Sequence, residues 1–394
     1  MPEPVEIVTV RRILTESVRV TSSTAGKHPI RIVGTCVIRD EPARRRDMTE
    51  YCWLLADSAW WGQDTWWGRC ALPLHDGLPA GPPRTREQVP DSARATYLRG
   101  TLLPGLHDAH VHSGLVELRE VRAGGIARVD DLGSSPTRIA ELLAHDDSSL
   151  PVCRFAGAML TAPGGYPSTR DWAQPDLYRQ VTSERDARLA VAEQRDLGAN
   201  SIKITLHTRA GPVLGDDVLR VIVDTAHDNG LYVVAHTEGT DTFSTALRHG
   251  VDRLAHVPWT ERIDEAALAA ARGMIWISTL DIHGYGHRTA ELECAQDNLR
   301  RFREHGGTVR YGTDLGNGPL PLGVNAREVA ALQQAGMSVD DVLLAMTDPD
   351  LSAPPCVIPE GLDSDPTGLA TALSTARVVR LTDEKHPGKR RAHD

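Results

Sequence analysis

The chain has 394 residues, of which 41% are hydrophobic and 24% charged, as is usual for a globular protein with one large domain or two. Its formal net charge of −10 argues against a nucleic-acid partner, which would require a basic surface. The sequence has no apolar run of the roughly 18 residues that a membrane span needs, and it begins without the features of a signal peptide, so we expect a cytoplasmic protein with no membrane partner.

Residues 1–98 are expected to form a small β-rich domain, because short β-type runs alternate there with charged and turn-rich stretches. The runs lie at 7–10, 18–21, 30–38, 52–55 and 95–98. Five of the eight tryptophans fall between Trp53 and Trp67. They are expected to form the core of this domain or its seam with the next one. The alternatives are an active-site wall or a subunit interface, where tryptophan is enriched, so a homo-oligomer is also considered.

Residues 99–348 repeat one order of features: a helical pattern, a glycine, a short apolar run and a polar residue. Each glycine stands where a helix would take a left-handed residue after its last turn. Short, largely apolar runs are typical of parallel strands that are buried on both faces. Eight such strands are predicted, at 102–107, 126–129, 151–157, 201–204, 231–235, 251–255, 274–278 and 308–311.

Eight strands that alternate with helices over about 250 residues predict an α/β fold, a (β/α)8 TIM-type barrel flanked by the small β-rich domain. A doubly wound open sheet is the alternative, and it is disfavoured because no GxGxxG motif follows a strand. Residues 349–383 are expected to be a loop and one strand, at 377–381, that returns to the small domain. The loop prediction rests on five prolines within 348–366. Residues 384–394 are expected to be a frayed, charged tail.

Six side chains that can ionise or bind metal lie at the carboxyl ends of five predicted strands. In a barrel these ends face one mouth, where active sites are built. Residues two apart on a strand point to the same face, so a His-x-His pair can bind one metal ion. The six are His110 and His112 in the first repeat, Lys203 in the fourth, His236 in the fifth, His256 in the sixth and Asp314 in the eighth.

Lys203 is the most informative of the six. It lies between Ile202 and Ile204, in an apolar run where a bare ammonium group would be costly to bury. Alone, Asp314 could equally be a helix N-cap, and each histidine an ordinary polar residue at a strand end. That all six stand at the right end of the right strand by coincidence is the less favoured interpretation.

Taken together, these motifs resemble those of the amidohydrolase superfamily, whose members are metal-dependent hydrolases on a (β/α)8 barrel with a small flanking β domain. The resemblance covers roughly residues 98–348 and is closest to the binuclear branch with imidazolonepropionase-like proteins and Xaa-Pro or Xaa-Arg dipeptidases. The motifs that carry it are Pro104-Gly-Leu-His-Asp-Ala-His-Val-His, Ile202-Lys-Ile, Val234-Ala-His, Leu254-Ala-His and Gly312-Thr-Asp.

The resemblance implies two divalent metal ions, with Zn²⁺ the expected identity, bridged by a lysine that CO2 has carboxylated. It also implies a metal-activated water that attacks a carbonyl group, with Asp314 as the catalytic base. Carried over residue by residue, the buried ion would be bound by His110, His112 and Asp314, the exposed ion by His236 and His256, and the bridge would be carboxylated Lys203.

Substrate-binding candidates lie on the predicted loops at the same mouth. Tyr166 stands where the binuclear branch commonly has a histidine, in a Gly-Gly-His segment. Arg170 could pair with a substrate carboxylate through both of its terminal nitrogens. The remaining candidates follow the fourth and seventh strands and are His207, His283, Tyr285 and His287.

The function implied by the resemblance is hydrolysis of a small-molecule substrate at the C–N bond of an amide, cyclic amide or dipeptide-like compound. Hydrolysis of an ester, lactone or phosphoester on the same binuclear site is one alternative. A mononuclear deaminase is another, although Lys203 would then have no role. Outside enzymes, the chain could be a catalytically silent binding module, but such a module has no need of a complete set of metal ligands.

Overall fold

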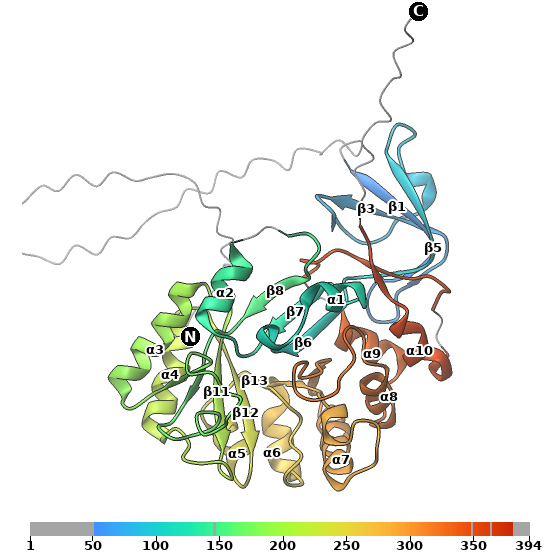
Figure 1. The fold of residues 1–394 in the computed structure, drawn as a ribbon. Helices are drawn as coiled ribbons and strands as arrows, with labels where there is room; N and C mark the ends of the chain where they lie inside the picture. The colour runs from blue at the N-terminus through green and yellow to red at the C-terminus, as the bar shows by residue number, and fades with distance from the viewer. Residues whose placement is uncertain (1–50, 145–146, 348–349, 363–364, 381–394) are drawn as a thin grey trace, which may run out of the picture. The chain divides into compact units, whose positions relative to one another are not determined.

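The computed structural model describes residues 51–380 except 145–146, 348–349 and 363–364 (Figure 1). The strands predicted at 7–10, 18–21 and 30–38 and the tail predicted at 384–394 lie outside the described residues. Among the described helices, none is both long enough and apolar enough to cross a membrane.

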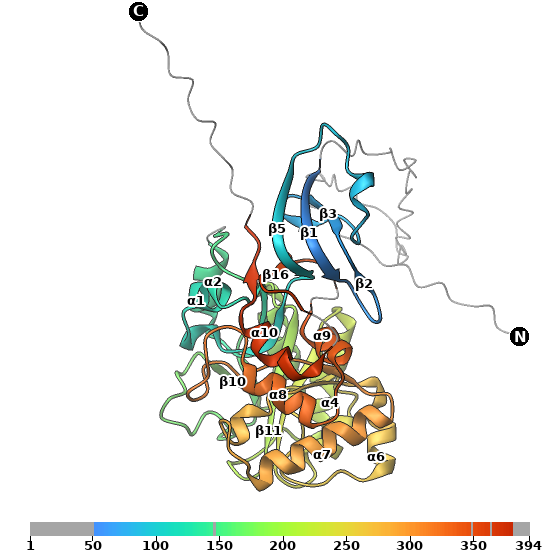
Figure 2. The same cartoon turned by 90° about the vertical axis from the view of Figure 1, so that its right-hand side faces the viewer.

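One seven-stranded sheet combines residues from both ends of the described chain. Its order is β17-β16-β5-β1-β3-β4, and β2 pairs with β1. Strands β1 and β5 run parallel, whereas β3 and β16 pair antiparallel with their neighbours (Figure 2). The strands are β1 (Cys52–Trp60), β2 (Trp66–Trp67), β3 (Cys70–His75), β4 (Leu78–Pro79), β5 (Ala95–Leu103), β16 (Cys356–Ile358) and β17 (Arg377–Val378).

The remaining strands form two all-parallel sheets in a TIM-barrel-like α/β arrangement. Their orders are β6-β7-β8 and β10-β9-β11-β12-β13-β14-β15. A closed ring of eight strands stays a prediction. The strands are β6 (His107–Val111), β7 (Arg128–Asp131), β8 (Val152–Phe155), β9 (Met159–Thr161), β10 (Tyr178–Gln180), β11 (Ser201–His207), β12 (Tyr232–Glu238), β13 (Arg253–Leu254), β14 (Ile275–Ile277) and β15 (Thr308–Arg310).

Helices separate most of these strands, although β8, β9 and β10 follow one another without a helix, and α3 to α6 lie on the outer side of β11, β12 and β13 (Figure 1). As predicted, Gly198 ends α3 in a left-handed conformation, with φ of 95°. The helices are α1 (Leu118–Ala123), α2 (Pro136–Leu143), α3 (Glu184–Leu197), α4 (Asp216–Asp228), α5 (Thr242–Arg248), α6 (Glu265–Ala270), α7 (Ala290–Glu304), α8 (Ala326–Gln334), α9 (Val339–Met346) and α10 (Leu369–Ser374).

Two of the five clustered tryptophans are buried, and the other three are half-buried. Trp53 and Trp60, both in β1, are buried, and the indole nitrogen of Trp60 donates a hydrogen bond of 2.6 Å to Asp340 in α9. Trp60 belongs to the hydrophobic core that also contains residues of the parallel sheets. Trp60 thus connects β1 to the core that the parallel sheets share, and the role of the whole cluster stays a prediction.

The predicted first barrel strand, at 102–107, is wrong in its bounds. Leu102 and Leu103 belong to β5 in the seven-stranded sheet, and the barrel strand is β6, which begins at His107. Pro104 and Gly105 separate the two strands. His110 therefore lies inside a strand, and His112 follows directly after it.

Two further predictions need correction. The strand predicted at 151–157 is shorter, because Gly157 adopts φ of 77° and a Cβ there would collide with the Gln194 side chain. The chain then forms β9 in the other parallel sheet. The loop predicted at 348–366 contains β16, a strand that exists because Cys356 to Ile358 pair with β5. Such pairing between distant segments leaves no local signal in a proline-rich stretch.

The helices should depend on their buried faces, and the chain offers a matched test. Leu299 in α7 is fully buried, whereas Leu189 in α3 is 52% exposed. We expect Leu299→Ala to lower the free energy of unfolding by about 2–5 kcal/mol, because it removes buried methyl groups and leaves a cavity. Leu189→Ala should change it by less than about 0.5 kcal/mol. Urea denaturation measures both, and equal losses would contradict the assignment of these faces.

Candidate metal centre and active site

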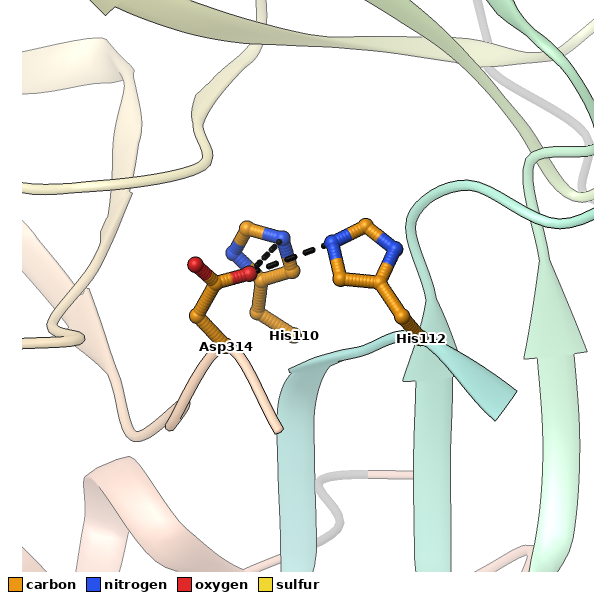
Figure 3. A group of neighbouring side chains, drawn as sticks. All are labelled: His110, His112 and Asp314. Atoms are coloured by element: carbon orange, nitrogen blue, oxygen red, sulfur yellow. Dashed lines mark hydrogen bonds and ion pairs between the residues drawn. The ribbon is translucent and has the colours of Figure 1, made fainter. Parts of the chain in front are cut away.

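Two histidines face one aspartate at the carboxyl ends of β6 and β15 (Figure 3). The Oδ1 atom of Asp314 lies 3.0 Å from Nε2 of His110 and 3.1 Å from Nε2 of His112. Asp314 has φ of 59°, a left-handed conformation that is uncommon for residues other than glycine and often marks functional sites. The three ligand atoms lie close enough together to hold a single metal ion.

The other ring nitrogen of each histidine faces a backbone carbonyl. Nδ1 of His110 lies 2.9 Å from the oxygen of Ala255, and Nδ1 of His112 lies 3.0 Å from the oxygen of Gly133. A carbonyl oxygen can only accept a hydrogen bond, so both Nδ1 atoms carry the proton. In the neutral imidazole, Nε2 then presents its lone pair to the carboxylate of Asp314. Lone pairs that converge in this way need a cation between them, and this donor set fits a divalent metal ion.

The pKa directions differ between the two imidazoles. Burial lowers the pKa of His110 well below its ordinary value, so this imidazole is neutral near pH 7. Burial also opposes protonation of His112, but the carboxylate of Asp314 outweighs it and raises the pKa of His112. When no metal ion is bound, a proton on His112 can thus supply the positive charge that Asp314 requires.

Lys203 lies inside β11, is 2% exposed, and makes no hydrogen bond or ion pair with any residue in the described part of the chain. Burial lowers the pKa of its amine to about 7, although the carboxylates of Asp314 and Asp131 act in the opposite direction. A large share of the side chain is therefore the neutral, nucleophilic amine at neutral pH. The sequence-based argument that this lysine would be costly to bury as an ammonium group agrees with its burial.

His236 and His256 lie beside this group. His236 is inside β12, His256 follows β13, and their ring centroids are 5.0 Å apart. Nδ1 of His256 lies 2.9 Å from the hydroxyl of Thr279. Burial lowers the pKa of both imidazoles, so both are available as neutral ligands.

A cavity of about 430 Å³ brings the predicted metal ligands together. Its walls also carry aromatic and apolar side chains, as is usual for small-molecule sites. The predicted metal ligands that line it are His110, His112, Lys203, His236, His256 and Asp314, and the other prominent lining residues are Met159, Tyr166, Trp172, Glu238, Trp259 and His283.

The predicted substrate residues divide into two groups. Tyr166 and His283 line the cavity, and His207 lies against it, with its ring centroid 4.9 Å from Tyr166 and 5.5 Å from His236. The other three do not line the cavity. Arg170 is exposed, with its guanidinium carbon 5.7 Å from the Tyr166 ring centroid. Tyr285 donates a hydrogen bond of 3.3 Å to the carbonyl of Asn317, and His287 is exposed.

Glu238 is a cavity residue that the sequence analysis missed. Its Oε1 atom lies 3.2 Å from Nε2 of His207, and its Oε2 atom makes a looser contact of 3.5 Å with Nε2 of His236. Burial would raise the pKa of this carboxyl, but the two imidazoles lower it strongly. The signal was present, because Glu238 follows His236 by two residues in a strand and must share its face.

Asp131 is a second residue that the sequence analysis missed, and it holds the loop whose backbone faces His112. It is fully buried and accepts hydrogen bonds from the backbone nitrogens of Gly133, at 2.9 Å, and Ser113, at 3.2 Å. Gly133 is the residue whose carbonyl faces His112. In the sequence Asp131 is a polar residue at the end of a predicted strand, and nothing distinguishes it from a polar residue of an ordinary turn.

Comparisons with known proteins agree with this geometry. Residues 101–348 match the amidohydrolase family. An uncharacterized protein of Mycobacterium tuberculosis is 31% identical over 277 residues, which are 62% of this chain and 72% of that protein. The structure of Aspergillus niger ochratoxinase has a TM-score of 0.68 at 18% identity and covers 83% of this chain and 94% of its own. A Xaa-Pro dipeptidase with bound methionine has a TM-score of 0.66 at 17% identity, with coverage of 83% and 97%.

Glu238 should orient His236 for metal binding through its contact with the ring nitrogen. Loss of such an outer carboxylate typically weakens metal affinity about 10–100-fold. We expect Glu238→Gln to weaken by this factor the affinity for the Zn²⁺ ion proposed at His236 and His256. The affinity for the ion proposed at His110, His112 and Asp314 should stay unchanged. Titration of metal-free protein against a chromogenic chelator measures both affinities. Glu117→Gln, an exposed substitution, is the control, and unchanged affinities in Glu238→Gln would contradict the assignment.

Proposed function

Since the chain belongs to the amidohydrolase family and is therefore a hydrolase, we propose that it cleaves the C–N bond of an amide, cyclic amide or dipeptide-like small molecule in the cytoplasm. The observation that carries the proposal is the convergence of the Nε2 atoms of His110 and His112 on Asp314, beside a buried Lys203 that has no partner among the described residues. Metal ligands, an acid–base group and a nucleophilic amine thus share one cavity.

The proposed centre holds two divalent ions, with Zn²⁺ the expected metal because imidazole and carboxylate ligands suit it. The neutral amine of Lys203 would attack CO2, form a new N–C bond and release a proton. The resulting carbamate carries one negative charge and offers two oxygen ligands. The buried ion would be held by His110, His112 and Asp314 and the exposed ion by His236 and His256, with carboxylated Lys203 shared between them.

When bound, the two ions would supply Lewis acidity and lower the pKa of a water molecule. Asp314 would hold this water and accept its proton, because its carboxylate lies at the centre of the ligand group. The side-chain nitrogen of Asn317 donates a hydrogen bond of 2.8 Å to Oδ2 of Asp314 and fixes the carboxylate plane. Asp314 would then deliver the proton to the leaving group.

The choice of a C–N bond rests on this proton path and on the family. An amine is a poor leaving group unless it is protonated, and the buried carboxyl of Asp314 can supply the proton. The Xaa-Pro dipeptidase among the similar structures fits the same chemistry. An ester or phosphoester could also be cleaved at such a centre, but its leaving oxygen depends less on protonation than the nitrogen of an amide does. A mononuclear deaminase would leave Lys203 without a role.

Asp314 should be required for turnover and less so for metal retention, because an asparagine in its place can still offer one oxygen. On any amide, lactam or dipeptide that the wild type hydrolyses, we expect Asp314→Asn to lower kcat about 10²–10⁴-fold, as for loss of a general acid–base group. Metal analysis of the same sample should show largely retained ions. Asp176→Asn, at an exposed position, should leave kcat unchanged. Near-normal turnover by Asp314→Asn would exclude this role.

Lys203 should control occupancy by the second ion. Protein purified without chelator should carry about two metal ions per chain, and Lys203→Ala should fall towards one. Because carbamate formation needs the neutral amine and burial lowers the pKa of Lys203 to about 7, uptake of the second ion should be faster at pH 8 than at pH 6 at a fixed CO2 concentration. One ion per chain that is insensitive to the substitution would favour the mononuclear deaminase. No metal even after reconstitution would favour a binding module.

A further inference from the structure

A second cavity, of about 530 Å³, shares no lining residue with the metal cavity. It lies along β8, from Pro151 before the strand to Phe155 at its last position, and it reaches Leu118 and Arg122 of α1. None of the proposed metal ligands belongs to β8 or α1. The second cavity is therefore a separate place in the fold.

Arg122 is the unusual residue of this cavity. It is only 5% exposed, its Nε atom is buried without an acceptor, and it makes no hydrogen bond or ion pair within the described residues. After burial, the largest effect on its pKa comes from the charge of Arg380, which has the same sign. Burial lowers the pKa of Arg122, yet a guanidinium group stays protonated in proteins. Charged side chains are rarely buried to this degree without a partner.

The two aspartates that line the cavity do not pair with Arg122. Asp147 forms an ion pair of 2.7 Å with Arg119, and Asp76 is largely exposed and lies 3.2 Å from a ring nitrogen of His75. The rest of the wall is mostly apolar, from Leu78, Leu118, Leu142, Leu150, Val152 and Phe155. The cavity thus combines a mostly apolar wall with a buried cation that has no partner among the described residues, and ligand sites commonly use a few polar groups in this way to fix orientation.

We propose that this cavity is a second ligand site, in which Arg122 binds the carboxylate of a small amphipathic monoanion whose hydrocarbon body packs on the apolar wall. A guanidinium group matches a carboxylate through two parallel hydrogen bonds. A monoanion fits better than a phosphate dianion, because one buried arginine balances one charge and Asp76 and Asp147 would repel a second. The cavity volume is in the usual range for a drug-sized ligand, about 300–1,000 Å³.

Octanoate is a suitable probe. Octanamide is a control that keeps the hydrocarbon chain without the charge, and acetate is a control that keeps the carboxylate without the chain. Calorimetric titration of the full-length, metal-loaded protein should show one octanoate site per chain. Octanamide and acetate should each bind at least about tenfold more weakly, because each lacks one half of the recognised structure. Failure of octanoate to bind at millimolar concentration, or equal binding of octanamide, would overturn the proposal.

Arg122→Met keeps much of the side-chain volume and removes the charge, so it should fold at least as well as the wild type. We expect it to lower octanoate affinity at least tenfold and to abolish the rise in Tm that octanoate gives the wild type. Arg220→Met, at an exposed position of α4, should change neither. Unchanged octanoate binding in Arg122→Met would place the ligand elsewhere, such as at the metal cavity, and would overturn the proposal.

The carboxylate could also come from the chain itself, since Asp383 and Glu384 follow Arg380 closely in the sequence. In that case octanoate would bind the double variant Asp383→Asn, Glu384→Gln but not the wild type, which would assign Arg122 to an internal contact and overturn the small-ligand site. Because the metal ligands do not line this cavity, the metal content of Arg122→Met should equal that of the wild type. Failure of the proposed hydrolase activity would leave these binding results unaffected.

Discussion

The structure depends on the join between the first parallel strand and the segment that follows the last. The backbone nitrogen of His112 donates to the carbonyl of Leu315 at 2.8 Å, and that of Leu315 donates to the carbonyl of His110 at 3.3 Å. These hydrogen bonds are made by two proposed metal ligands and by the residue after the third. Any ion held by the three side chains would therefore also brace this join, so metal binding and folding should be coupled.

Two motif residues without a role in the chemistry serve the same join. Asp108 is buried and accepts two hydrogen bonds from Thr313, one of 2.6 Å from the hydroxyl and one of 3.1 Å from the backbone nitrogen. These bonds connect β6 to the turn that carries Asp314. Burial raises the pKa of Asp108 to about 7 despite these donors. Gly312 is required for packing, because a Cβ there would collide with the side chain of Ile277. The motifs around His110 and Asp314 thus describe one structural unit from two distant parts of the chain.

The sequence was informative where a property is local. Spacing of two along a strand placed His110 with His112, and the cost of burying an amine singled out Lys203. The ends of the other predicted strands placed His236, His256 and Asp314 at the same mouth, and the family resemblance then implied their roles as metal ligands. Glu238 obeys the same spacing rule with His236, so its place on the cavity side of the strand is also a local property. β16 could not be predicted, because its residues become a strand only through pairing with β5, and Asp131 acquires its role only from loops that the fold brings beside it.

Lys203 and Arg122 are two buried cations that find no partner among the described residues, and their chemistry separates them. An amine can escape the cost of burial by losing its proton, and the pKa of Lys203, lowered to about 7, places this change within the physiological range. The neutral amine that results is a nucleophile, so burial creates reactivity at this position. A guanidinium group cannot lose its proton under the same conditions. At Arg122 the charge therefore persists, and the compensation must come from an anion rather than from a change in the side chain itself.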